Sequence, residues 1–268
     1  MKHAKTALIP AIVIAALASA TFAHEDVLVA LDSSGRIVTG TADYDHGVYT
    51  LGKRTFGFHP PGPLSGLYAT TDPGYNAVKQ ADLPAGYTAL PGAADLKFDI
   101  AADTIGGTTA NFWYWDGADD DNDGDYYDDV DWTPVSAGQT YEFELLVFSA
   151  IADGSAAGVA GFTIATTDAD GGLHKHLNMY IDDGDGSEAT APVDGFYLVG
   201  IDLYMDEPDA QRSETLYFVP GVGDHTPAQH RDGAVAWVND NLVVPEPASL
   251  SLLAMGGLAL LRRRRQRV

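Results

Sequence analysis

Apolar and polar residues alternate in short blocks through most of the chain, and glycine, proline or aspartate separates the blocks. In Tyr141-Glu142-Phe143-Glu144-Leu145 the period of two residues is typical of a strand that buries one face. The pattern predicts strands over Val27–Leu31, Arg36–Thr39, Gly47–Leu51, Thr55–Phe58, Leu96–Ile100, Asn111–Trp115, Thr140–Phe148, Val159–Thr163, Leu173–Ile181, Phe196–Met205 and Leu216–Val219.

Short strands at this spacing, with turn residues between them, predict an all-β protein. We expect a jelly-roll-like β-sandwich rather than βαβ units. The Asp-Ser-Ser-Gly stretch at Asp32–Gly35 lies between two predicted strands and indicates a hairpin turn. The region Pro60–Pro91 is rich in glycine and proline and is predicted to be a long ordered loop.

One short C-terminal helix is predicted from about Pro227 to Asn239. Thr226 is a suitable N-cap, and proline is tolerated in the first turn of a helix. Ala234, Trp237 and Val238 fall on one face of this helix, which we expect to pack on the sandwich.

The N-terminal stretch Met1–Ala23 has the composition of a secretory signal peptide. Lys2 and Lys5 precede an apolar run, and small residues follow it. We expect a signal helix that signal peptidase removes after Ala23, with cleavage after Ala20 as the alternative.

The C-terminal stretch combines a turn, an apolar run and a basic end. Pro245 and Pro247, on either side of Glu246, prevent a helix from crossing that point. The uncharged run Ala248–Leu261 would be ~21 Å long as a helix, against a bilayer core of ~30 Å. The arginines that follow can extend this short anchor helix by reaching the lipid headgroups. A buried helix of the fold is the less favoured alternative, because these arginines have no acidic residue beside them.

Val244-Pro245-Glu246-Pro247, the apolar run and the terminal arginine cluster, in this order, resemble the PEP-CTERM sorting signal. The resemblance covers residues 243–268. It implies an exported protein that is anchored transiently in the inner membrane and is processed by an exosortase. The chain then divides into a signal peptide (1–23), a β-sandwich body (24–242) and a sorting and anchor segment (243–268). The expected location is the cell envelope, the cell surface or the extracellular space.

The body between the two ends is strongly acidic. All 38 acidic residues lie between residues 24 and 247, counting Glu246 of the sorting motif, with only eight of the 15 basic residues, which leaves a net charge of about −30. Such a surface repels nucleic acid and anionic lipid and attracts cations, so we expect no nucleic-acid partner. The chain contains no cysteine, so burial and strand pairing alone must hold the fold.

Histidines are the first candidate metal ligands. On a strand over Leu173–Ile181, His174 and His176 share the face opposite the apolar residues, ~6.6 Å apart, and can offer two nitrogens to one ion. His230, near the predicted helix, is expected to approach the same face. His24 would become the N-terminal residue after cleavage, so its amine and ring could chelate together. The pattern predicts zinc or copper, and the alternative is a polar surface whose charge varies with pH.

A second candidate site is acidic. Asp119, Asp121 and Asp123 stand at alternate positions before a glycine, as at the start of a calcium-binding loop. The twelfth position of such a loop should be an acid, but here it is Val130. These aspartates therefore form either a calcium site or an acidic loop exposed to solvent.

The sequence offers no distinct catalytic motif. Cysteine and a Gly-x-Ser-x-Gly motif are absent, and carboxylates are too numerous for one pair to stand out. Phe112–Trp115 is either a platform that stacks on sugars or a strand with one buried face.

We therefore expect an exported, non-catalytic protein of the cell surface or extracellular matrix, with exopolysaccharide as a candidate partner. The alternative is an envelope protein that binds zinc or copper through its histidines. A third hypothesis is a carbohydrate-active or copper enzyme. A mature chain that begins with histidine on a β-sandwich resembles copper-dependent oxidative polysaccharide enzymes, but this resemblance rests on His24 alone.

Overall fold

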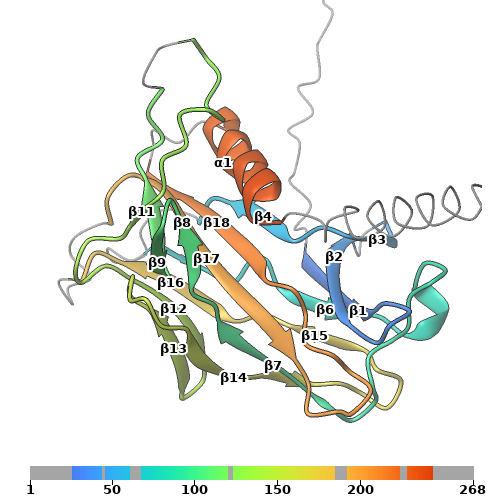
Figure 1. The fold of residues 1–268 in the computed structure, drawn as a ribbon. Coiled ribbons are helices and arrows are strands. Elements are labelled where there is room, and N and C mark those ends of the chain that lie inside the picture. Colours follow the sequence, from blue (N-terminus) through green and yellow to red (C-terminus); the bar gives the residue numbers. More distant parts are fainter. Residues whose placement is uncertain are drawn as a thin grey trace, which may run out of the picture.

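The computed structural model describes residues 26–43, 46–60, 68–119, 123–184, 192–223 and 228–243. Strands are the main regular structure, and they form open sheets that pack as a sandwich, with one helix near the C-terminal end (Figure 1). The expected β-sandwich with a short C-terminal helix is confirmed. The predicted signal helix and anchor helix lie outside the described residues.

Three sheets and a hairpin make up the sandwich. The five-stranded sheet has the spatial order β15 (Leu173–Lys175), β6 (Tyr75–Ala77), β1 (Asp26–Leu31), β2 (Ile37–Asp43) and β3 (Val48–Leu51). The four-stranded sheet has the order β13 (Phe148–Ala152), β12 (Thr140–Leu145), β16 (Asn178–Asp182) and β5 (Tyr68–Thr70).

The largest sheet has seven strands. Its main order is β11 (Thr133–Pro134), β10 (Trp113–Trp115), β17 (Gly195–Tyr204), β18 (Leu216–Val222) and β4 (Thr55–Phe58). In addition, β7 (Asp95–Ile100) pairs with β17, and β14 (Val159–Thr166) pairs with β7. The separate hairpin consists of β8 (Asp103–Ile105) and β9 (Thr108–Ala110). A short 3-10 helix, η1, spans Gln80–Asp82, and the helix α1 spans Ala228–Asn241.

The seven-stranded sheet is buried on both faces, and its central strand shows why. Tyr197, Val199 and Ile201 of β17 point into the main core, while Phe196 and Leu198 point to the opposite face, which α1 covers. A strand buried on both sides needs a nearly continuous apolar sequence. The run Gly195–Tyr204 provides it, because eight of its ten residues are buried.

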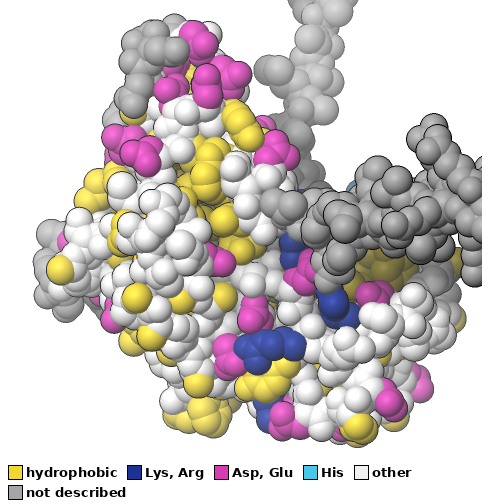
Figure 2. All heavy atoms as spheres, in the orientation of Figure 1, with side chains coloured by type: hydrophobic (Ala, Val, Ile, Leu, Met, Phe, Trp, Pro, Cys, Tyr) yellow, Lys and Arg dark blue, Asp and Glu magenta, His cyan; other side chains and the backbone are white. Residues whose placement is uncertain are grey.

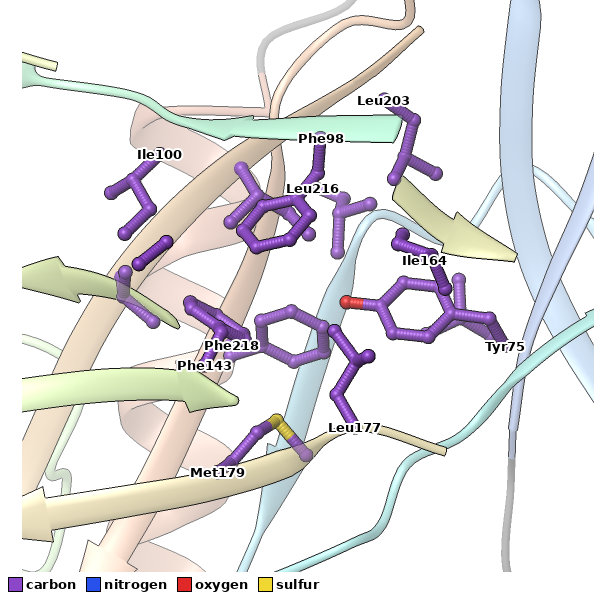
Figure 3. Close-up of a cluster of buried hydrophobic side chains, with 14 of the residues drawn as sticks. Tyr75, Phe98, Ile100, Phe143, Ile164, Leu177, Met179, Leu203, Leu216 and Phe218 are labelled. Atoms are coloured by element: carbon purple, nitrogen blue, oxygen red, sulfur yellow. The ribbon is translucent and has the colours of Figure 1, made fainter. Parts of the chain in front are cut away.

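The main core lies between the sheets (Figure 3). Phe98 of β7 and Phe143 of β12 meet edge to face, with ring centroids 5.2 Å apart, and Phe143 lies 6.0 Å from Phe218 of β18. Tyr75 reaches into the same cluster from the five-stranded sheet. Each fully buried large side chain contributes about 1.5–3 kcal/mol. This packing replaces the disulfide bonds that a chain without cysteine cannot form.

Several strand predictions hold, among them Leu96–Ile100, where burial alternates along β7. The strand over Thr55–Phe58 was predicted with its observed bounds, and the turn at Asp32–Gly35 is confirmed, with Asp32 Oδ1 accepting the Ser34 N–H at 2.8 Å. The helix begins at Ala228 and ends at Asn241, with Ala234 and Val238 buried as expected. Its predicted first residues, Thr226 and Pro227, lie outside the described residues.

Three predictions of local structure were wrong. The strand predicted over Thr140–Phe148 is two strands, because Leu146 takes a positive φ of 59° and the chain reverses there. The strand predicted over Leu173–Ile181 is also two, β15 and β16, which belong to different sheets. The supposed loop Pro60–Pro91 contains β5, β6 and η1, whose three residues each are too few to show a period.

Two buried tyrosines generate a prediction about stability. Tyr75 and Tyr141 are fully buried, and their hydroxyls have no hydrogen-bond partner among the described residues. Burial raises the pKa of both phenols well above the ordinary tyrosine value, so both stay neutral. An unpaired buried hydroxyl costs ~1–3 kcal/mol. We expect Tyr141→Phe to raise the free energy of unfolding in urea by about 1 kcal/mol.

The matched control is Tyr197→Phe. The Tyr197 hydroxyl donates to the Val193 carbonyl at 2.8 Å, so its removal should lower the free energy of unfolding. If Tyr141→Phe is destabilised as much as Tyr197→Phe, the Tyr141 hydroxyl has a partner and the prediction is wrong.

Candidate metal centre

Three neighbouring strands carry the candidate site on one face of the five-stranded sheet. Leu28 of β1 pairs with Asn76 of β6, and Asn76 pairs with His174 of β15. Side chains two residues apart along a strand share a face. Asp26, two residues before Leu28, and His176, two residues after His174, therefore extend the same face toward each other.

A glycine makes room for the second histidine. Gly74 lies beside Asp26, because the Asp26 carboxylate accepts the Gly74 N–H at 2.9 Å. A Cβ atom at residue 74 would stand only 2.6 Å from His176 Cε1, closer than a side chain can approach. The absence of a side chain at residue 74 thus allows the His176 ring to lie against the backbone.

The structure brings Asp26, His174 and His176 together. The two Nε2 atoms are 2.9 Å apart, and His174 Nε2 is 3.5 Å from Asp26 Oδ2. One ligand atom from each of the three residues lies within 4.8 Å of the other two. In the part of the chain that the structure describes, these three residues form the one group of at least three possible metal ligands whose ligand atoms lie this close together.

A hydrogen bond orients the His176 ring. Its Nδ1 lies 2.8 Å from the Thr71 carbonyl oxygen. A carbonyl can only accept, so Nδ1 must carry the proton, and in the neutral ring Nε2 presents its lone pair toward His174. Asp72 reinforces this orientation, with Oδ1 3.3 Å from the same Nδ1. Metal-bound histidines commonly have such a partner on the other ring nitrogen.

Two hydrogen-bond donors fix the position of the Asp26 carboxylate. Asp26 is 6% exposed, and it is the one charged residue in the buried class among the residues that the structure describes. Gly74 N–H donates to its Oδ1 and Asn76 Nδ2 donates to its Oδ2. A buried carboxylate needs such donors, because removing a charge from water is costly. The Asn76 Oδ1 atom is itself buried and has no partner among the described residues.

These donors fit a divalent transition-metal ion. Imidazole nitrogen and carboxylate oxygen are ligands that zinc and copper accept. Around tetrahedral zinc, two nitrogens at ~2.0–2.1 Å from the ion stand ~3.3 Å apart, close to the spacing here. Three protein ligands would leave a coordination position open toward solvent, since the His174 side chain is 54% exposed. Without an ion, the same atoms form a hydrogen-bonded chain in which His174 Nε2–H donates to His176 Nε2.

The structure places His230 elsewhere. His230 lies on α1, where its Nδ1 is 2.8 Å from the Gly117 carbonyl and its ring stacks on Tyr126 with centroids 3.6 Å apart. It therefore packs the acidic loop against the helix and is not part of the group formed by His174 and His176.

Hydrogen bonds within the acidic loop join the parts of it that the structure describes. Asp119 Oδ2 accepts the Gly124 N–H at 3.2 Å, and Asp123 Oδ1 accepts the Asp125 N–H at 2.7 Å. Short-range bonds of this kind are common in aspartate-rich turns. Asp119 Oδ1 is buried and has no partner among the described residues. Asp121, the central predicted ligand, lies outside them, so calcium here stays a prediction.

Other predicted residues also lie outside the described part of the chain. They are His24 and the sorting motif Pro245, Glu246 and Pro247. His24 precedes Asp26 by two positions in the sequence.

The aromatic run is part of a core, which corrects the sugar-platform reading. Trp113 and Trp115 are 1% and 3% exposed and lie in the apolar cluster under α1. Trp113 Nε1–H donates to the Ala110 carbonyl at 3.1 Å. Neither indole can stack on a sugar without unpacking the helix.

Sequence reasoning missed Asp26, Gly74 and Asn76. Asp26 is the first residue of the otherwise apolar strand Asp-Val-Leu-Val-Ala-Leu. An acidic residue directly before an apolar run is the sequence feature that could have indicated its role. Gly74 and Asn76 lie in the segment that was predicted to be a loop, so nothing indicated that they face His176 and His174.

The described body is thus a β-sandwich with a candidate metal centre near the start of its first strand.

Comparison with known protein families concerns the C-terminal part of the chain. The sequence model of the PEP-CTERM protein-sorting motif matches residues 243–265. The motif is processed by exosortase and implies export to the cell envelope or surface. The chain has no significant match among curated proteins or solved structures. Across the described ranges, no helix combines the length and apolar character that a bilayer crossing requires.

The close approach at Gly74 generates a prediction. Gly74→Ala should push the His176 ring away from the Thr71 carbonyl and move its Nε2 from His174. Loss of such a supporting contact typically weakens metal binding 10- to 100-fold, and we expect an effect of about that size for zinc. Competition with a chromophoric chelator measures the change.

Gly86→Ala is the control for a destabilising glycine substitution away from the site. A Cβ there meets nothing within 4 Å, but the φ of 95° is one that alanine adopts only with strain, so this variant should lose stability and keep its zinc affinity. Equal zinc affinity of the Gly74→Ala variant and the wild-type protein would show that the position of the His176 ring does not matter for binding.

Proposed function

We propose that the body is a non-catalytic protein of the cell surface or extracellular matrix that binds one zinc or copper ion through Asp26, His174 and His176. The observation that carries the proposal is the convergence of the three donor atoms within 4.8 Å. The Thr71 carbonyl supports it by keeping the His176 proton on Nδ1, which leaves Nε2 available to an ion.

The charge of the body supports cation binding at this place. With a net charge of about −30 over the body, the protein attracts cations from solution. On the face in Figure 2, lysine and arginine side chains lie beside acidic ones. Among the described residues, Arg36 pairs with Glu214 and Lys97 pairs with Asp206. Gly74 N–H and Asn76 Nδ2, which donate to the Asp26 carboxylate, are both neutral, and His174 Nε2 at 3.5 Å is itself a candidate ligand. The carboxylate charge therefore remains to offset that of an ion.

The exposure of the site supports a binding role rather than a catalytic one. Hydrolytic metal sites gain much of their strength by excluding water, which strengthens electrostatic interactions. His174 and His176 have side chains that are 54% and 35% exposed. An ion held there would remain in contact with solvent.

The sorting motif supports the proposed export and processing of the chain. Signal peptidase would remove residues 1–23, the tail would contact the inner membrane transiently, and exosortase would then process it. An exopolysaccharide partner belongs to this proposal as well, but Trp113 and Trp115 do not contribute to it because both are buried.

The processed protein should bind one zinc ion per chain. Equilibrium dialysis followed by elemental analysis measures the ratio, with copper in a parallel experiment. His174→Ala and His176→Ala each remove one of three ligands and should lower the zinc affinity at least 10-fold. His46→Ala is the matched control, because His46 is an exposed histidine paired with Asp43 at 2.8 Å. A wild-type protein without stoichiometric metal, or binding that survives both substitutions, would overturn the proposed site.

Export predicts two cuts in the chain. Intact-mass measurement of the protein recovered outside the cytosol should give a chain that begins at His24 and lacks the terminal arginines. A recovered protein that retains the arginine cluster would contradict processing by exosortase, and a chain that retains Met1–Ala23 would contradict removal of the signal peptide.

A further inference from the structure

The candidate site lies where the chain passes twice between two sheets. β5 belongs to the four-stranded sheet and β6 to the five-stranded sheet, and residues 71–74 connect them. β16 and β15 belong to the same two sheets, and residues 176–177 connect them. β5 pairs with β16 and β6 pairs with β15, so the two connections run side by side. We call this place the seam.

Each of the three candidate ligands contacts the seam. His176 lies in one connection and donates from Nδ1 to Thr71 in the other. Asp26 of β1 accepts the N–H of Gly74, the last residue of the 71–74 connection. His174 belongs to β15, whose three residues all pair with β6. The side chains that could hold an ion therefore come from the 176–177 connection and from the strands β1 and β15, and two of them hydrogen-bond to the 71–74 connection.

Little else holds the outer strand of this sheet. β15 pairs with β6 over three residues, and it is the last strand of the five-stranded sheet. Such a short edge strand opens easily, because few hydrogen bonds must break. Leu177, which follows His176, is fully buried in the main core, so opening of the seam would also expose core surface.

We infer that an ion bound by Asp26, His174 and His176 closes the seam and so couples metal supply to the attachment of β15 and β6 to the sheet. This inference rests on the proposed metal binding. An ion that joins Asp26 to both histidines spans three adjacent strands, β1, β6 and β15. The seam cannot open while all three ligands stay bound, so the ion suppresses that local motion in proportion to its occupancy.

Hydrogen exchange read by mass spectrometry tests this inference on the processed protein with and without zinc chloride. At a zinc concentration 100 times the dissociation constant, seam amides that exchange through local opening should slow about 100-fold. The affected peptides should cover residues 68–77 and residues 173–182. Peptides from α1 serve as the internal reference and should keep their rates, since α1 packs on β4 and β18.

Two variants separate the ligands from the fold. Asp26→Asn should reduce the zinc effect on both peptides while keeping an acceptor for Gly74 N–H. His174→Ala changes an exposed side chain, should fold normally, and should reduce the zinc effect equally. His46→Ala should show the full effect.

Slower exchange in both peptides supports the seam inference. Zinc that binds stoichiometrically without slowing exchange, or that slows residues 173–182 alone, would overturn it and leave the proposed metal binding intact. A protein that binds no zinc would overturn both.

Discussion

The buried carboxylate of Asp26 is the interaction on which the start of the fold depends. A charge that is 6% exposed is tolerated only if donors or cations replace the water it has lost. Gly74, the last residue of the connection between two sheets, and Asn76 of β6 supply two donors. Satisfying this one charge therefore fixes β1 against β6. Because β15 pairs with β6, the same contacts also set the positions of His174 and His176.

The seam lies at the edge of the five-stranded sheet, beside the well-packed core of the body. The seven-stranded sheet has an apolar core on each face, one shared with the other sheets and one covered by α1. Aromatic contacts such as Phe98–Phe143 connect the strands across the main core. This packing does not involve the three candidate ligands. A chain without cysteine can thus leave a polar, partly exposed site at the seam without weakening its centre.

Much of the fold follows from the sequence because apolar blocks mark its central strands, alternating with polar residues in β7 and nearly continuous in β17. Thr55–Phe58 and Phe196–Met205 are cases in which the apolar pattern alone locates the strand. The pattern fails where apolar residues are exposed, as at Leu146 and Val147, which are 83% and 89% exposed at a turn. It also fails at β6, since the three residues that follow Pro73-Gly74 are too few to show a period. That failure hid the candidate metal centre, because β6 is the strand that places Asp26 beside His174.

X-ray absorption at the zinc edge of the zinc-loaded protein tests the central claim most directly. The account predicts a first shell that includes two imidazole nitrogens and a carboxylate oxygen at ~2.0–2.2 Å, with the imidazole scattering lost when His174 and His176 are both replaced by alanine. A shell built of oxygen alone, or one that the double substitution leaves unchanged, would show that zinc binds elsewhere, and the account of this site would be wrong.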